Sequence, residues 1–321
     1  MIKYNNFSKL GKQLADGEFI LTGELEPEKT CDLSHLIQEA NEMAPYVVAA
    51  NVTDSPLAIV TINSLAASHI IQEASGIECI WQLTVRDCNK IGIAGQIMGA
   101  EALGIHNILS LTGDHTALGD CPKSKPVFDL DSATLIQLVR EMVDMGSING
   151  REIEHPPKMH VGAAANPNAD PMEAEILKIG RKSEAGCEFI QTQVVYDIER
   201  TIEFLREINR YKVPVLLGIF PMKSYAIAKG FDMFVPGVDV PKEILARWKM
   251  VKTNISDKKE QKEKYDQLNY DFFKPFITEL KSKKLLAGVH CMAVHYTRIF
   301  PKLIEVIKDQ NVVEIIRNST I

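Results

Sequence analysis

The sequence predicts a single-domain (β/α)8 TIM barrel that extends over residues 1–321. Eight short runs rich in apolar and β-branched residues recur along the chain, and amphipathic stretches with helical periodicity separate them. Several of the eight runs are almost continuously apolar, as expected of strands that are covered on both faces. Because eight parallel strands can close into a barrel without leaving a sheet edge, this pattern favours a barrel over a doubly wound open sheet.

The expected strands and helices alternate along the chain, as βα units do. The strands are expected at 19–26, 46–53, 78–85, 106–113, 159–165, 188–195, 213–220 and 286–294. Helical periodicity covers the segments 32–43, 59–74, 94–104, 132–146, 171–186 and 198–210. Three of these helices are expected to end at or near Gly104, Gly146 and Gly186, because glycine commonly ends a helix before the chain turns into a strand.

The long segment between the last two expected strands predicts two or more extra helices. The charged run 256–268 belongs to one of them, and its Lys and Glu side chains are most simply a solvated helix face. No G-x-G-x-x-G motif follows the first strand, so the sequence does not indicate a Rossmann domain.

The overall charge and hydropathy pattern exclude several classes of function. The formal net charge is −6, and Lys and Arg are scattered along the chain, so we expect no nucleic-acid partner. The first residues lack the apolar core of a signal peptide, and no apolar run approaches the roughly 20 residues that cross a bilayer. We therefore expect a cytoplasmic protein that is not inserted in a membrane.

The cysteines and histidines give no metal-binding pattern. Six cysteines are spread through the chain without a C-x-x-C pair, which predicts free thiols rather than disulfides or a structural zinc site. His290 and His295 are five positions apart, so they would point to opposite faces of a strand. We therefore predict no metal site in this chain.

Polar side chains close most of the expected strands. In barrels of this kind the chemistry lies at the carboxyl ends of the strands, so these residues are the candidates for an active site. They are Glu24, Glu26, Asn51, Thr53, Asp54, Gln82, Thr84, Arg86, Asp87, Thr112, Gly113, Asp114, His115, Asn166, Asn168, Gln191, Gln193, His290 and His295.

Two carboxylates in this set, Glu24 and Asp114, come from the first and fourth strands. Two such groups can divide the work of acid and base if their surroundings keep a proton on one of them. The alternative is that both are solvated loop carboxylates.

Seven segments at the strand ends together resemble methylenetetrahydrofolate reductases, flavin-dependent barrel enzymes. In order, they are TGELEPEKT, NVTD, QLTVRD, SLTGDH, GAAANP, GRKSEAGCEFIQTQ and GIFPMKSYAIAKGF, and the resemblance extends from about residue 18 to the final strand. It implies reduction of 5,10-methylenetetrahydrofolate to 5-methyltetrahydrofolate, by hydride transfer from flavin N5. We expect no C-terminal regulatory domain.

The resemblance also assigns roles to individual residues. It makes Glu24 the general acid that protonates the folate, and Asp114 the second catalytic residue, beside the flavin and the pterin. The substrate would further contact Gln193, Ile227, Phe231 and Tyr296. The positions implied to bind the cofactor are Thr53, Gln82, Thr112, Gly113, Asp114, Phe128, Asp129, Ala164, Asn166, Asn168, Glu175, Arg181 and Lys182. Arg181 and Lys182 are adjacent cations suited to phosphate oxygens.

The chain departs from the family pattern at several of these positions. Thr112 replaces an arginine near the flavin pyrophosphate, so either FAD or FMN fits the pattern. Gln82 replaces a histidine, and Ala164 replaces a tyrosine. Ile227 replaces a glutamine and His295-Tyr296 replaces Asn-Arg, near where reduced nicotinamide and folate alternate.

The last two departures, at Ile227 and at His295-Tyr296, concern the source of electrons. NADH or NADPH is one candidate donor. The other is a separate subunit containing zinc and iron–sulfur centres, as in the acetyl-CoA pathway reductases of anaerobes, which this chain resembles most.

Two other functions fit the same polar rim. One is a flavin-free methyltransferase linked to folate or to a corrinoid, and the other is a non-catalytic subunit of an electron-transfer complex. The visible spectrum of the protein distinguishes the first from a flavoenzyme, and folate turnover distinguishes the second. An oligomer is expected.

Overall fold

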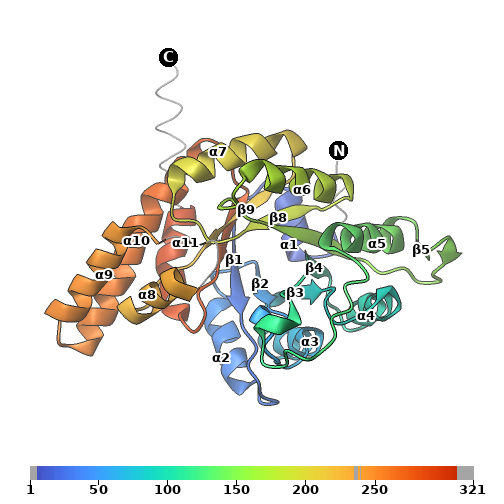
Figure 1. Cartoon of the computed structure of the whole chain (residues 1–321), viewed down its shortest axis with the longest axis horizontal. Helices are drawn as coiled ribbons and strands as arrows, with labels where there is room; N and C mark the ends of the chain where they lie inside the picture. The colour runs from blue at the N-terminus through green and yellow to red at the C-terminus, as the bar shows by residue number, and fades with distance from the viewer. Residues whose placement is uncertain (1–5, 235–237, 239, 309–321) are drawn as a thin grey trace.

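In the computed structural model, eight parallel strands form a closed barrel in the order β1-β10-β9-β8-β7-β4-β3-β2 (Figure 1). The structure describes residues 6–234, 238 and 240–308. The barrel strands are β1 (Ile20–Leu25), β2 (Ala49–Val52), β3 (Glu78–Thr84), β4 (Asn107–Leu111), β7 (His160–Ala165), β8 (Phe189–Thr192), β9 (Val215–Ile219) and β10 (Gly288–Cys291). Each expected strand is present and somewhat shorter than expected, so the predicted (β/α)8 barrel is confirmed.

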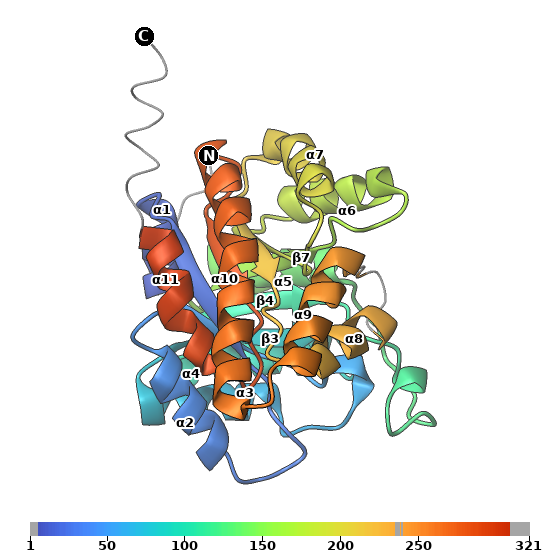
Figure 2. The same ribbon diagram turned by 90° about the vertical axis from the view of Figure 1, so that its left-hand side faces the viewer.

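Helices surround the barrel (Figure 1). They are α2 (Ser34–Met43), α3 (Ser64–Ser75), α4 (Lys90–Ala102), α5 (Ser132–Asp144), α6 (Met172–Glu184), α7 (Ile198–Ile208), α8 (Tyr225–Phe234), α9 (Lys242–Asn254), α10 (Lys258–Ser282) and α11 (Phe300–Lys308). Helices α8, α9 and α10 are the extra helices predicted between the last two strands, and α10 runs beside α11 (Figure 2). Among the described helices, none is both long and apolar enough to span a bilayer.

Two elements were not expected from the sequence. A two-stranded hairpin, β5 (Ser147–Ile148) with β6 (Arg151–Glu152), follows α5. A short helix, α1 (Lys9–Ala15), precedes β1, and its Leu10 and Leu14 join a cluster of buried side chains from inside the barrel. Helix α1 therefore closes the amino-terminal end of the barrel, which leaves the carboxyl end for a site.

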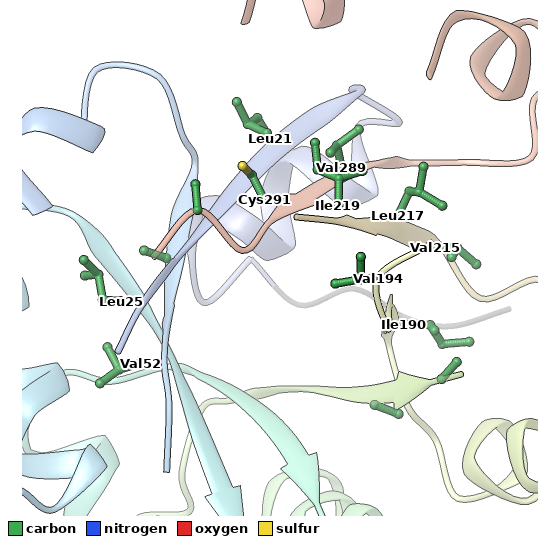
Figure 3. Packing of buried hydrophobic residues seen from close by; sticks show 14 of the residues in the cluster. Leu21, Leu25, Val52, Ile190, Val194, Val215, Leu217, Ile219, Val289 and Cys291 are labelled. Atoms are coloured by element: carbon green, nitrogen blue, oxygen red, sulfur yellow. The ribbon is translucent and has the colours of Figure 1, made fainter. Parts of the chain in front are cut away.

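The core has two layers because alternate residues of each strand face opposite sides. Ile20 belongs to the small inner cluster, whereas its neighbour Leu21 belongs to the large cluster between the strands and the helices. Figure 3 shows part of this outer layer, including Leu21 of β1, Leu217 of β9 and Val289 of β10. Because other side chains cover both faces of each strand, the sequence of the strands is a nearly continuous apolar run.

The barrel closes where β1 pairs with β10, and this seam requires a glycine. Gly288 pairs with Ile20, and a Cβ atom on Gly288 would lie 2.3 Å from the carbonyl oxygen of Ile20. A backbone atom cannot move away as a flexible side chain can. Glycine at this position therefore lets the first and last strands approach each other.

Gly288→Ala should lower the free energy of unfolding by about 1–3 kcal/mol, because the added methyl group overpacks the seam. Gly95→Ala is the matched control inside α4, because no described residue beyond its chain neighbours and the local helix backbone comes within 4 Å of a Cβ atom there. The control should gain about 0.5–1 kcal/mol from the better helix propensity of alanine. Urea denaturation measures both changes, and equal stabilities of the two variants would contradict the explanation.

Candidate active site

A cavity of about 320 Å³ opens at the carboxyl ends of the barrel strands. Its lining combines amides, a carboxylate and an imidazole with apolar side chains, as small-molecule sites commonly do. The lining residues are Glu24, Asn51, Gln82, Leu109, Leu111, Ala164, Ala165, Asn166, Glu175, Lys182, Gln191, Thr192, Gln193, His290 and Met292. Of the residues predicted for the site, the cavity brings together Glu24, Gln82, Ala164, Asn166, Glu175, Lys182 and Gln193.

Glu24 lies in a polar cluster built by three strands. Its side chain is 12% exposed, and its Oε2 accepts a hydrogen bond from Nε2 of Gln82 at 3.3 Å. Nε2 of His290 lies 3.4 Å from the same oxygen, and Nδ1 of His290 lies 3.0 Å from the hydroxyl of Thr22. Thr22 thus orients the imidazole, and the imidazole can exchange a proton with the Glu24 carboxyl group.

A second carboxyl group follows Glu24 on the same strand face. Glu26 comes directly after β1, and its pKa is raised by burial and by the negative charge of Glu24. Glu26 does not line the cavity. A proton is therefore easier to keep on Glu26 than on an exposed glutamate, but Glu24 is the carboxyl group at the cavity wall.

Two buried amides pair across the barrel below the opening. Nδ2 of Asn51 donates to Oε1 of Gln191 at 2.7 Å, and Nε2 of Gln191 donates to Oδ1 of Asn51 at 3.0 Å. The sequence pattern places both residues, and His290, at strand ends, but it assigns none of them a role in the reaction. Strand alternation could have assigned them, because Gln191 shares a face with the predicted Gln193.

The opposite wall of the cavity comes from β7 and α6. Nζ of Lys182 donates to the carbonyl oxygen of Ala164 at 2.6 Å, and Glu175 accepts from the backbone amide of Asn166 at 3.1 Å. Lys182 is 9% exposed, and burial lowers the pKa of its amino group. Arg181, predicted beside Lys182, is exposed and pairs with Asp131 at 3.0 Å, so the two cations do not lie together in the cavity.

The loops after β4 place another group of predicted residues on the rim, outside the cavity lining. These residues are Thr112, Gly113, Asp114, Phe128 and Asp129. Asp114 is exposed, and its Oδ2 accepts from the backbone amide of Leu57 at 2.8 Å. The pair of carboxylates predicted from the sequence, Glu24 and Asp114, therefore has one member in the cavity and one on the rim.

Four more predicted residues lie outside the lining of the cavity: Asn168, Ile227, Phe231 and Tyr296. The ring of Phe231 stacks on Phe220, with 4.1 Å between centroids. Tyr296 is buried, and its hydroxyl contacts Asp266 and accepts a hydrogen bond from Asn269 at 3.1 Å. Burial raises the pKa of Tyr296, and these contacts keep its hydroxyl inside the protein.

Thr53, predicted to contact the cofactor, also lies outside the lining and has an unusual environment. The residue is 6% exposed, and its hydroxyl has no hydrogen-bond partner in the described part of the chain. Buried polar groups are normally hydrogen-bonded, so an unpartnered hydroxyl near a site is consistent with a ligand that supplies the partner.

Comparisons with known proteins agree on one family. The family model described as methylenetetrahydrofolate reductase matches residues 9–307. Methylenetetrahydrofolate reductase 2 of Schizosaccharomyces pombe is 24% identical over 230 residues, which cover 69% of this chain and 35% of that protein. The 5,10-methylenetetrahydrofolate reductase of Salmonella typhimurium is 26% identical over 163 residues, which cover 50% of each protein. The matches thus span half or less of the length of these relatives.

One solved structure has the same fold over nearly the whole chain. It is an uncharacterized protein from Clostridium thermocellum that binds two copies of 5-methyl-5,6,7,8-tetrahydrofolic acid. The TM-score is 0.63 at 18% sequence identity, and the alignment covers 95% of this chain and 100% of that chain.

The lowered pKa of Lys182 predicts how stability depends on pH. The unfolded chain binds this proton more tightly than the folded protein, so the free energy of unfolding should rise as pH increases from the folded pKa toward 10.5. Lys182→Met should flatten this rise in urea denaturation between pH 7 and pH 10. Lys229→Met, at an exposed position, should leave the slope unchanged; equal slopes in both variants would contradict the account.

Proposed function

Because the chain belongs to the methylenetetrahydrofolate reductase family, whose model matches residues 9–307, we propose that it reduces 5,10-methylenetetrahydrofolate to 5-methyltetrahydrofolate with a bound flavin. The observation that carries this proposal is the placement of Glu24. Its carboxyl group lies in the wall of a strand-end cavity, next to an imidazole that can exchange a proton with it. Opening the methylene bridge of the substrate requires a proton donor at such a place.

The neutral amides of the cavity suit the pterin ring of the substrate. A pterin is flat and carries several hydrogen-bond donors and acceptors, and Gln193 and Asn166 line the wall with amide groups whose oxygens accept from the backbone amides of Val194 and Asn168. This orients their NH₂ groups as donors for a ligand. Leu109, Leu111 and Met292 provide apolar surface for the ring faces. We assign Gln193 to the pterin, with Asp114 and Phe231 contacting the substrate from the rim.

The residues present fit a flavin, as FAD or FMN. Thr53 has a buried hydroxyl that finds no partner among the described residues, and Lys182 places a buried cation at the cavity. A cation and a hydroxyl are suitable groups for the polar atoms of such a cofactor. A bound flavin would supply the redox chemistry: it would accept two electrons, as a hydride from a nicotinamide or one at a time from an iron–sulfur partner, and would pass a hydride to the methylene carbon.

Glu24 and His290 handle the proton of the reaction. When Nε2 of His290 carries its proton, it donates to the Glu24 carboxylate; in the other tautomer, Nε2 accepts from protonated Glu24. The hydroxyl of Thr22 adapts to both tautomers, because it can donate or accept at Nδ1. Glu24 thus delivers the proton to the folate and, being partly exposed at the cavity wall, regains one from water there, while His290 stabilises the carboxyl group in either protonation state.

The electron donor is either NADH or NADPH, or a partner subunit with zinc and iron–sulfur centres. Anaerobic mixing of the purified protein with each nucleotide, followed by methylenetetrahydrofolate, tests flavin, donor and substrate in one series. Bleaching of the flavin absorbance by a nucleotide supports direct use of that donor. Bleaching by a low-potential reductant alone supports a partner subunit, and a colourless protein that takes up no flavin overturns the proposal.

The cytoplasmic location and the oligomer stay predictions.

Glu24→Gln should lower the rate of folate reduction by roughly 10²–10⁴-fold, because an amide cannot donate the proton, while flavin reduction by the donor continues. Stopped-flow measurement of the two half-reactions separates these effects. Glu26→Gln is the matched control, since Glu26 lies two residues away and outside the cavity lining. A larger loss in the control than in Glu24→Gln would reassign the acid.

Thr53→Val should weaken flavin binding by about fivefold to tenfold, because the isosteric side chain cannot hydrogen-bond. It should not destabilise the flavin-free protein, since no residue that the structure describes bonds to the hydroxyl. Thr84→Val is the comparison, because the Thr84 hydroxyl bonds to Asp54 at 2.8 Å and its loss should lower stability. Flavin fluorescence titration and urea denaturation measure both properties; unchanged flavin affinity in Thr53→Val would remove Thr53 from the cofactor site.

A further inference from the structure

A second cluster of polar side chains lies outside the cavity, between α2 and the segment after β10. His35 and Glu39 are one helical turn apart on α2, and His295 follows the last strand. One nitrogen from each histidine and one oxygen from Glu39 all lie within 4.8 Å of one another. Nδ1 of His295 is 2.7 Å from Oε1 of Glu39, and Nε2 of His35 is 3.9 Å from that oxygen.

Glu39 is an unusual surface-helix residue because its carboxylate is buried. It is 7% exposed, and the two side chains that the structure places against its Oε1 are imidazoles. A buried carboxylate is costly unless a cation or several hydrogen bonds compensate for its charge. The Lys223 ammonium attracts the carboxylate electrostatically and neutral imidazoles compensate weakly, whereas a metal ion held by all three groups would neutralise the charge directly.

The backbone at His295 is left-handed. Its φ is +53°, in a region that His, Asn and Asp enter more often than most other non-glycine residues. The His35 and His295 rings lie 5.2 Å apart at 53°, so they are tilted rather than stacked. The left-handed backbone at His295 accompanies the contact of its side chain with Glu39 on α2.

Two further charged groups contact His295. Oε1 of Glu28 lies 3.7 Å from Nε2 of His295 and adds a second carboxylate beside the cluster. Nζ of Lys223 donates to the carbonyl oxygens of Val294 and His295 at 3.2 Å and 3.4 Å. The Lys223 ammonium is the charge that opposes a bound cation, and its hydrogen bonds are to the main chain rather than to the three side chains.

We propose that His35, Glu39 and His295 bind a divalent transition-metal ion, with zinc as the best match. Two imidazoles and one carboxylate form a ligand set that zinc accepts, with a fourth position for water. The spread of the three ligand atoms is compatible with metal–ligand bonds of about 2.0–2.2 Å after small side-chain movements. The ion would join α2 to the segment that follows β10, and so reinforce the seam between the first and last strands.

Titration of the metal-stripped protein with cobalt(II) tests this site, because the visible absorption bands of bound cobalt(II) depend on the type and geometry of its ligands. We expect saturation at one equivalent, and a rise in Tm with zinc that depends on its concentration. Loss of a direct ligand should cost more than the ~10–100-fold loss of affinity that outer-shell changes cause. His35→Ala and His295→Ala should therefore abolish stoichiometric binding and the rise in Tm. His155→Ala, at an exposed histidine outside the cluster, should retain both.

Three results would overturn the proposal. The first is the absence of saturable cobalt binding by the wild-type protein, which would leave the cluster as hydrogen-bonded His–Glu pairs. The second is equal affinity in the wild-type protein and in the two ligand variants. The third is an intense thiolate charge-transfer band, which would assign the ion to cysteines such as the exposed Cys31. Circular dichroism confirms that each variant is folded, and none of these readouts depends on enzyme activity.

Discussion

The pairing of β1 with β10 is the contact on which the rest of the molecule depends. This seam joins the first and last strands of the barrel, and its register places Thr22 opposite His290. Thr22 can therefore orient the imidazole, which in turn reaches Glu24 on the same strand as Thr22. Gly288 permits this closeness, because any side chain there would collide with the main chain of β1. A small shift along the seam would separate the Glu24 carboxyl group from the His290 imidazole. The same strand pairing therefore closes the barrel and holds these two groups together.

The interior of the barrel is apolar in its middle and polar toward its carboxyl end. Leu10 of α1 and Phe189 of β8 lie in the inner apolar cluster, and the Asn51–Gln191 pair follows beneath the cavity. The two amides satisfy each other, which removes most of the cost of burying them. The cavity above is therefore bounded by a rigid polar floor rather than by mobile side chains. This arrangement suits an enzyme that must orient a flat, polar ring and admit little water.

Charged groups around the barrel mouth differ in how their charge is balanced. Lys182 is buried against a carbonyl oxygen, and its lowered pKa shows that burial opposes its charge. Asp114 is exposed on the rim and bonded to a backbone amide. Glu39 is buried between imidazoles at the seam. Glu175 offsets part of the charge of Lys182, and Lys223 offsets part of the charge of Glu39. A phosphate near Lys182 and a metal ion near Glu39 would each add opposite charge to a buried group.

The sequence by itself determined the barrel, its eight strands, the extra helices before β10 and the strand ends that carry Glu24, Gln82 and Gln193. Period-2 alternation and unbroken apolar runs are local patterns, so they can be read without knowing which strands are neighbours. Only the tertiary structure decided which rim residues share the cavity. It placed Asp114 and Tyr296 outside the lining, brought His290 to Glu24, and set His295 beside α2. These relations depend on barrel closure and loop paths, which join residues far apart in the chain and leave no periodic signal in it.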